Sequence, residues 1–180
     1  RVVVDTREKC PYQFAHSVAK ALPTGDYSLE GLEGEIAIER KSMADCYGSL
    51  GQRRDNFQAE WERMADMRFA AVVIEASLVE FLGQADSRLS PKAAINSLIS
   101  WQVRYGVPVW FAGSRSLGKG IVWNALRHFW IHRCVEIKEA RWQGGLPFFP
   151  KGLASQGDAN HESNKQGTSR RVTSQLAIQR

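Results

Sequence analysis

The sequence predicts an α/β protein in which a mixed, partly parallel sheet is covered by helices. Short apolar runs typical of strands alternate along the chain with longer segments of helical periodicity. The run at 69–75 (FAAVVIE) is apolar almost throughout, as expected of a strand covered on both faces. Alternation of this kind favours parallel strand pairs with helices on the faces of the sheet.

Four segments are expected to be strands. The first, 1–5 (RVVVD), is rich in β-branched residues and ends in a charge. The second, 35–41 (EIAIERK), alternates between apolar and charged residues with a period of two. The apolar run 69–75 and the segment 107–111 (VPVWF) are expected to be buried strands.

Three segments are expected to be helices. The first covers 42–67, where Ser42 and Asp45 resemble an N-terminal cap pair. Its apolar residues keep helical spacing at Leu50, Phe57, Trp61 and Met64. The second helix starts at Ser90-Pro91 and runs to about residue 105, and the third covers 116–133.

The composition fits one domain with a sizeable core, since 43% of the 180 residues are hydrophobic and 24% are charged. We expect 1–143 to fold and 144–180 to form a disordered basic tail, because 151–180 lack aromatic residues and are rich in Ser, Gln, Asn and Gly. Residues 1–150 carry 19 Lys and Arg against 17 Asp and Glu, a net of +2, so the other +3 of the total +5 lies in the tail. This modest basicity is compatible with nucleic acid binding.

The sequence also excludes several classes of protein. No run approaches the roughly 18 apolar residues that a membrane helix needs, and the first residues lack the apolar stretch of a secretory signal. Cys10, Cys46 and Cys134 lie far apart and form no CxxC pair, which disfavours a disulfide framework and a typical zinc ribbon. We therefore expect an intracellular protein of the cytoplasm or nucleoid, or of the nucleus in a eukaryote, with no membrane partner.

Acidic residues gather where the expected strands begin or end. Asp5 and Glu8 follow the first strand, Asp26 follows a Pro-Thr-Gly turn, and Glu39 and Lys41 end the second strand. The period of two sends Glu39 and Lys41 to the same face of the sheet. Carboxylates suit a hard divalent cation such as Mg²⁺ or Mn²⁺, and a nearby ammonium can offset charge that develops on a phosphate. The pattern is therefore suited to phosphodiester hydrolysis.

The full spelling of these segments resembles one nuclease family. Gly25-Asp26, then Glu39-Arg40-Lys41, then Asp45 reproduce the pattern GD-x(n)-ERK-xxx-D, and residues 4–8 match VDxRE. The sequence is thus similar to the XPF/Hef-type nuclease domain, a branch of the PD-(D/E)xK nucleases, from about residue 1 to 133. The resemblance implies a restriction-endonuclease-like fold, in which a mixed sheet is flanked by helices.

The resemblance also implies the metal ligands. These would be Asp5, Asp26 and Glu39, with Glu8 as an additional acidic ligand or water-mediated partner. The expected cofactor is Mg²⁺ or Mn²⁺.

The remaining motif positions would act on the substrate or on these ligands. Lys41 would be the catalytic lysine, and Arg40 and Arg7 would steady phosphate or the carboxylates of the site. Asp45 would orient those basic groups from the first turn of the following helix.

The activity implied by the resemblance is metal-dependent hydrolysis of phosphodiester bonds in branched, forked or flap DNA, during replication, recombination or repair. The alternative is a catalytically silent DNA-binding scaffold subunit for a partner nuclease or helicase, which a completely filled signature disfavours. Well-known relatives add a helix-hairpin-helix module or a helicase, whereas this sequence shows neither. We therefore expect a stand-alone form of the nuclease domain.

The third expected helix carries an apolar stripe at Trp123, Leu126, Trp130 and Cys134. A stripe of this spacing is typical of core packing. Because members of the family pair through this region, it also indicates a homodimer, or pairing with another subunit, through the C-terminal helix of the domain.

Three further signals are weaker. Arg53 and Arg54 lie close in sequence to the site and are candidate DNA contacts. The segment 113–119 satisfies GxxxxGK, but Gly120 stands where a P-loop needs Ser or Thr, so no nucleotide cofactor is expected. His128 and His132 have the spacing of zinc ligands but lack the Glu of HExxH, so zinc is not expected.

Overall fold

The computed structural model describes residues 1–84 and 88–142. Its centre is a mixed sheet of six strands in the order β2-β1-β3-β4-β5-β6. The strands are β1 (Val2–Val4), β2 (Ser17–Ala19), β3 (Tyr27–Leu29), β4 (Ile36–Lys41), β5 (Phe69–Ile74) and β6 (Val109–Phe111). β4, β5 and β6 pair in parallel, as do β1 and β2, whereas β3 is antiparallel to both of its neighbours. The predicted α/β fold with a mixed sheet is confirmed.

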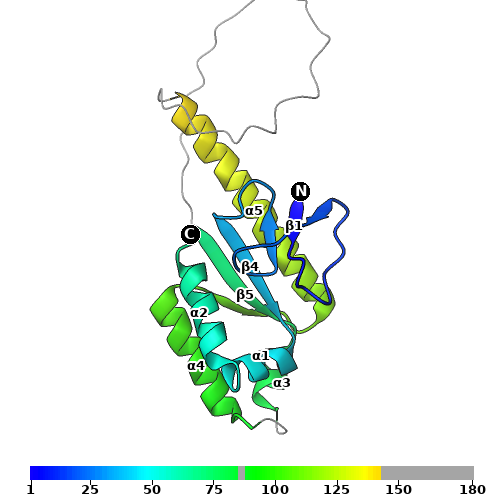
Figure 1. Ribbon diagram of the computed structural model, residues 1–180, viewed down its shortest axis with the longest axis vertical. Helices are drawn as coiled ribbons and strands as arrows, with labels where there is room; N and C mark the ends of the chain where they lie inside the picture. The colour runs from blue at the N-terminus through cyan, green and yellow to red at the C-terminus, as the bar shows by residue number, and fades with distance from the viewer. Residues whose placement is uncertain (85–87, 143–180) are drawn as a thin grey trace, which may run out of the picture. The chain divides into compact units, whose positions relative to one another are not determined.

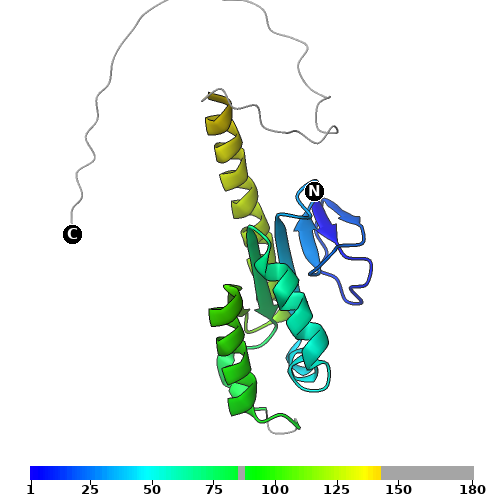
Figure 2. The same ribbon diagram turned by 60° about the vertical axis from the view of Figure 1, so that its left-hand side comes forward.

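Helices cover both faces of this sheet (Figures 1 and 2). They are α1 (Met43–Leu50), α2 (Arg54–Ala65), α3 (Leu78–Leu82), α4 (Pro91–Tyr105) and α5 (Arg115–Trp142). Residues of α1 to α4 share one core cluster with the sheet, and residues of α5 share the other. None of the helices within 1–84 and 88–142 combines the length and apolar character needed to cross a lipid bilayer.

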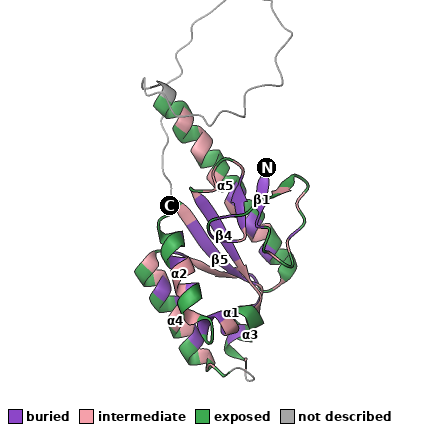
Figure 3. Cartoon of the chain, viewed as in Figure 1, coloured by how far each residue is buried: buried purple, intermediate pink, exposed green. Residues whose placement is uncertain are grey.

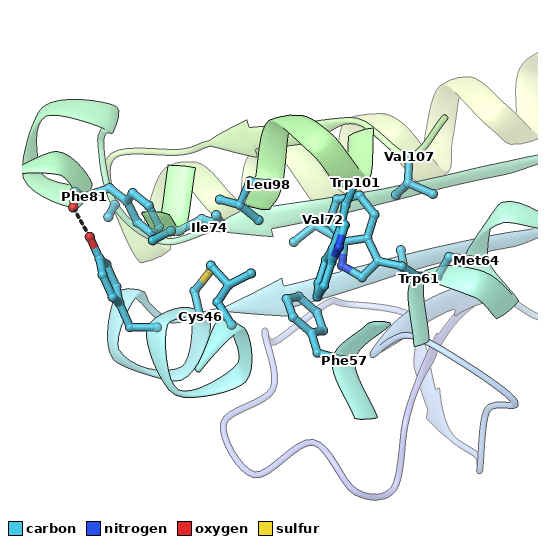
Figure 4. Packing of buried hydrophobic residues seen from close by; sticks show 14 of the residues in the cluster. Cys46, Phe57, Trp61, Met64, Val72, Ile74, Phe81, Leu98, Trp101 and Val107 are labelled. Atoms are coloured by element: carbon cyan, nitrogen blue, oxygen red, sulfur yellow. Dashed lines mark hydrogen bonds between the residues drawn. The ribbon is translucent and has the colours of Figure 1, made fainter. Parts of the chain in front are cut away.

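The central strand β5 supplies both cores, and Figure 3 shows β4 and β5 buried between the layers. Val72 packs with Phe57 and Trp61 of α2 in the first cluster (Figure 4). Its neighbour Val73 points the other way and packs with Leu126 of α5. An apolar residue is therefore required at consecutive positions, which explains the uninterrupted run seen in the sequence.

Several predicted elements differ from those observed. The helix predicted over 42–67 is two helices, because Gly51 leaves helical geometry at φ −95° and ψ −98° and ends α1. Ser42 caps α1 by accepting from the Asp45 amide, and Ser90 caps α4, as predicted. β2, β3 and α3 were not predicted, since segments of three to five residues contain too little periodicity to recognise.

The last helix extends further than predicted. α5 ends at Trp142 rather than at Arg133, and an ion pair links Arg133 to Glu136 of the unpredicted extension. The predicted disordered tail at 144–180 lies outside the described residues, so that prediction remains untested.

Candidate active site

Strand β4 delivers charged side chains to opposite faces of the sheet. Glu39 and Lys41 point to the face covered by α1 and α2, where they form an ion pair. The Lys41 ammonium also lies 4.8 Å from the centre of the Phe57 ring in α2. Arg40 points to the face covered by α5, where its guanidinium pairs with Glu8 and Glu75. The alternation predicted from the sequence therefore separates the ERK triplet into two environments.

Asp26 reaches the Glu39 side because of a tight turn before β3. Gly25 has φ +72°, and a Cβ there would lie 3.1 Å from the Ala37 Cβ, so the turn favours glycine. The Asp26 amide donates to the Ile38 carbonyl at 2.9 Å. Its carboxylate accepts from the Arg40 amide at 2.8 Å. These two bonds fix Asp26 beside β4.

The Glu39 side holds more negative charge than Lys41 can neutralise. Burial raises the pKa of Asp26 to about 7, and the charges of Glu8 and Glu60 add to this against the hydrogen bond from the Arg40 amide. Burial and the charge of Asp26 hold the pKa of Glu39 well above its usual range. Burial lowers the pKa of Lys41, but the negative charges of Glu39, Glu60 and Asp26 together outweigh burial and leave that pKa above its ordinary value. The site thus favours an additional cation.

Two other predicted ligands are held by protein groups. Asp5 is 3% exposed and accepts from the Leu22 amide at 2.6 Å and from the Arg7 amide and guanidinium at 2.7 Å. Burial opposes ionisation of Asp5, but the hydrogen bonds from Arg7 and Leu22 lower its pKa below the ordinary value. Glu8 accepts from Arg40 at 2.9 Å and from the Cys10 amide at 2.6 Å. Asp5 and Glu8 therefore stabilise the loop that follows β1.

The carboxylates of Asp26 and Glu39 open into a polar cleft of about 300 Å³. Its lining residues are Arg7, Glu8, Lys9, Asp26, Glu39, Arg40, Lys41, Asp45, Ser49 and Arg53. Of the two predicted DNA contacts, Arg53 lines the cleft. Arg54 instead stacks 4.8 Å from the Trp101 ring and donates to Ser97 of α4.

Some residues of the site were not singled out by sequence reasoning. Lys9 and Ser49 line the cleft, and the charge of Glu60 in α2 raises the pKa of Glu39. Lys9 directly follows the VDxRE segment at 4–8, so its position next to Glu8 was a usable signal. Glu60 carries no such signal, because it comes next to the site only through the packing of α2 on the sheet.

The donor set fits a hard divalent cation bound through few protein ligands. Asp26 and Glu39 offer carboxylate oxygens at a place with excess negative charge, and Mg²⁺ is commonly held by one or two carboxylates together with waters. Within the described residues, no group of three or more His, Cys, Asp or Glu side chains is gathered closely enough to hold a metal ion by itself. Metal binding at Asp26 and Glu39 stays a prediction.

The weaker sequence signals are also placed by the structure. Most of the GxxxxGK segment lies in the first turns of α5, where Gly118 packs against Tyr12, so it is not a phosphate-binding loop. Of the apolar stripe, Leu126 is buried, whereas Trp123 and Trp130 are 46% and 43% exposed. The core interpretation therefore holds for Leu126 and not for the two tryptophans.

Comparison with known proteins adds family information. A family model described as the ERCC4 domain matches residues 4–118, well over half of the chain. The structure is similar to XPF from Aeropyrum pernix, with 21% identity, a TM-score of 0.57 and coverage of 79% of this chain and 69% of that one. A second similar structure is XPF from Aeropyrum pernix in complex with DNA, with 20% identity, a TM-score of 0.57 and coverage of 70% and 62%. No curated protein matches the sequence.

Proposed function

The chain belongs to the ERCC4-domain family and has the XPF-type nuclease fold, and from this premise we propose that it is a metal-dependent DNA endonuclease that cuts branched, forked or flap DNA. The observation that carries the proposal is the convergence of Asp26, Glu39 and Lys41 in one cleft with basic residues on its rim. The DNA complex of the similar Aeropyrum pernix protein supports DNA as the substrate polymer.

The proposed chemistry divides between the acidic and basic residues. A Mg²⁺ or Mn²⁺ ion held by Asp26 and Glu39 would acidify water and offset charge on the scissile phosphate. Asp26 is kept in place by the Arg40 amide at 2.8 Å. Lys41 stays protonated because the surrounding carboxylates keep its pKa above the ordinary value, so its ammonium is a hydrogen-bond donor for a phosphate oxygen.

Basic residues around the cleft would position the DNA backbone. Arg7, Lys9 and Arg53 line it together with the acidic pair. Contacts to phosphate fix the register of a protein on DNA without reading its sequence. This arrangement suits an enzyme that selects DNA by shape, which supports a branched rather than a sequence-defined substrate.

The test is cleavage of labelled duplex, splayed fork, flap and four-way junction DNA with Mg²⁺ or Mn²⁺. We expect cutting of branched DNA that needs the metal and falls roughly a thousandfold in Asp26→Asn and in Lys41→Ala. Lys138→Ala is the matched control, because Lys138 is exposed on α5 and lies outside the cleft. If the wild type binds branched DNA but never cuts it, the scaffold alternative replaces the nuclease.

We also propose that the chain pairs through α5, as a homodimer or with another subunit. Apolar side chains stay exposed along this helix at Trp123, Trp130, Ile131 and Val135. Several large apolar side chains exposed on one helix are typical of an interaction site. The mass of the protein in solution, measured by light scattering, is expected to be that of a dimer and to fall in Trp130→Arg. Glu139→Arg, at an exposed polar position of the same helix, should leave it unchanged.

A further inference from the structure

A second charged cluster lies on the α5 side of the sheet. Two of its members also line the cleft, but the proposed chemistry gives its side chains no role. It consists of Glu8, Arg40, Glu75 and Arg115, here called the Glu75 cluster. Glu75 follows β5, and each of its carboxylate oxygens binds a different arginine: Oε2 lies 3.1 Å from Arg40 and Oε1 lies 3.0 Å from Arg115. Two acidic and two basic groups are present, so the cluster is balanced in charge.

The two arginines of the Glu75 cluster hold the same short segment, residues 8–12. Arg40 binds the Glu8 carboxylate, which also accepts from the Cys10 amide at 2.6 Å. Arg115 donates to the Cys10 carbonyl at 2.7 Å and to the Pro11 carbonyl at 3.1 Å. Its guanidinium also lies 4.9 Å from the centre of the Tyr12 ring. Glu75 therefore links the segment to β4 through one arginine and to α5 through the other.

Segment 8–12 carries one side of the candidate active site. Lys9 lines the cleft and sits between Glu8 and Cys10, the two residues that the cluster ties down. Among the described residues, no hydrogen bond or ion pair holds the Lys9 side chain itself. Its place at the cleft thus depends on the backbone on either side of it.

We propose that Glu75 and Arg115 are positioning residues that hold segment 8–12 so that Lys9 meets the DNA backbone at the rim of the cleft. The inference rests on the proposed nuclease function and extends it to two residues outside the recognised motif. A segment that is already ordered loses less conformational entropy when a ligand binds, so its loosening weakens binding. Because Lys9 would bind ground state and transition state alike, the loss should appear in KM rather than in kcat.

Arg115 is the position at which to test this inference. Its side chain is 47% exposed, so replacing it removes the contacts to the segment without opening the core. Arg115→Met removes charge and contacts together. Arg115→Lys keeps the charge but cannot reproduce the forked contacts to Glu75 and two carbonyls. Arg127→Met, at an exposed arginine of the same helix, controls for loss of one positive charge.

Three experiments are made on each variant. They measure hydrogen exchange of the amides in residues 8–12, the dissociation constant for fork DNA in Ca²⁺, and the steady-state constants kcat and KM in Mg²⁺. Arg115→Met and Arg115→Lys should both speed exchange in the segment. Both should also raise the dissociation constant and KM about tenfold, with kcat changed less than about threefold. Arg127→Met should match the wild type, and Glu75→Gln should act in the same direction as Arg115→Met.

The outcomes separate this inference from the proposed function. Unchanged exchange, or faster exchange with unchanged DNA affinity, overturns the positioning role even if the wild type cleaves DNA. Wild-type behaviour of Arg115→Lys also overturns it, because charge alone would then account for Arg115→Met. Failure of the wild type to cut in Mg²⁺ removes the nuclease proposal, whereas exchange and affinity in Ca²⁺ still decide whether the segment is positioned for DNA.

Discussion

The two faces of β4 carry similar numbers of charged side chains, but they differ in how completely these charges are paired. On the α5 face, Arg40 is buried between Glu8 and Glu75, and Arg115 completes a balanced set of four charges. On the other face, Glu39 and Asp26 share the ammonium of Lys41, and the charge of Glu60 lies nearby. The same strand thus carries one ionic network with balanced charge and another with excess negative charge.

This difference separates structural charge from functional charge. Buried ion pairs persist in a fold when each charge has a partner, because an unpaired charge in the interior is costly. Asp26 departs from this rule, since its pKa is raised to about 7 by burial and by neighbouring carboxylates. Groups with strongly perturbed pKa values in a cleft are typical of functional sites. We infer that the excess negative charge on the Glu39 face serves to bind a cation. We also infer that the ion pairs on the Arg40 face hold the loop after β1 in place.

The largest expected effect is on catalysis, from Glu39→Gln. Loss of one carboxylate from the acidic pair should lower kcat for fork cleavage roughly a thousandfold. The free energy of unfolding should change by less than about 1 kcal/mol, because Asp26 and Glu60 still lie near Lys41. Single-turnover cleavage and urea unfolding measure the two quantities. A large loss of stability would show that Glu39 is structural and would remove the contrast between the faces.

The neighbouring residue should respond in the opposite way. Arg40→Met leaves Glu8 and Glu75 as buried carboxylates without their shared arginine. Removing one partner of a buried ionic network costs about 3 kcal/mol. Urea unfolding should therefore show a clear loss of stability at pH 7, in contrast to Glu39→Gln. If the two variants have equal stability, the Arg40 face is not the structural one.

Much of the fold could be predicted, and the unpredicted part has a physical explanation. Strands β4 and β5 and helices α4 and α5 carry long periodic or apolar signals in their own residues, and β1 and β6 lie inside the longer runs 1–5 and 107–111. β2 and β3 are three residues long, and they are strands because β1 lies between them and pairs with both. A strand that depends on its neighbours in this way leaves little trace in its own sequence.

The same limit applies to the candidate site. Asp26, Glu39 and Lys41 could be placed together from motif spacing and from the period of β4. The resemblance gave phosphate or the carboxylates of the site as targets of Arg7 and Arg40, but which carboxylate each arginine holds depends on where the loop after β1 folds back. Glu75 and Arg115 lie 35 and 75 residues beyond Arg40, and only the packing of β5 and α5 brings them to it.

The imbalance on the Glu39 face also predicts an unusual pH dependence of stability. The folded pKa of Asp26 is raised to about 7 from an ordinary value of 3.8, so the folded state binds a proton more tightly than the unfolded state. The metal-free protein should therefore lose stability as pH rises from about 4 to about 7, on the order of 3 kcal/mol. Thermal unfolding in EDTA measures this slope.

Two comparisons sharpen the pH prediction. Asp26→Asn should make the slope shallower, because the amide does not titrate. Added Mg²⁺ should restore stability at pH 8 in the wild type but much less in Asp26→Asn. A flat profile in the wild type between pH 4 and pH 7 would contradict an unbalanced site.

The smallest expected effect tests how closely the α5 face is packed. A Cβ at Gly118 would overlap the hydroxyl oxygen of Tyr12, a residue of the loop that the Glu75 cluster holds. Gly118→Ala should cost about 1 kcal/mol in urea unfolding, because overpacking of about 2 kcal/mol is partly offset by about 1 kcal/mol of helix propensity.

Two matched variants decide whether that cost comes from the loop. Gly120→Ala lies on the same helix with nothing within 4 Å of its Cβ, so it should stabilise by about 1 kcal/mol. In a Tyr12→Phe background the overlapping oxygen is gone, and Gly118→Ala should change from destabilising to neutral or stabilising. If Gly118→Ala costs the same in both backgrounds, the Tyr12 hydroxyl is not the source of the cost, and the loop moves away from the added Cβ at Tyr12. The contrast between the structural Arg40 face and the cation-binding Glu39 face would then be supported by the pairing of their charges and not by tight packing.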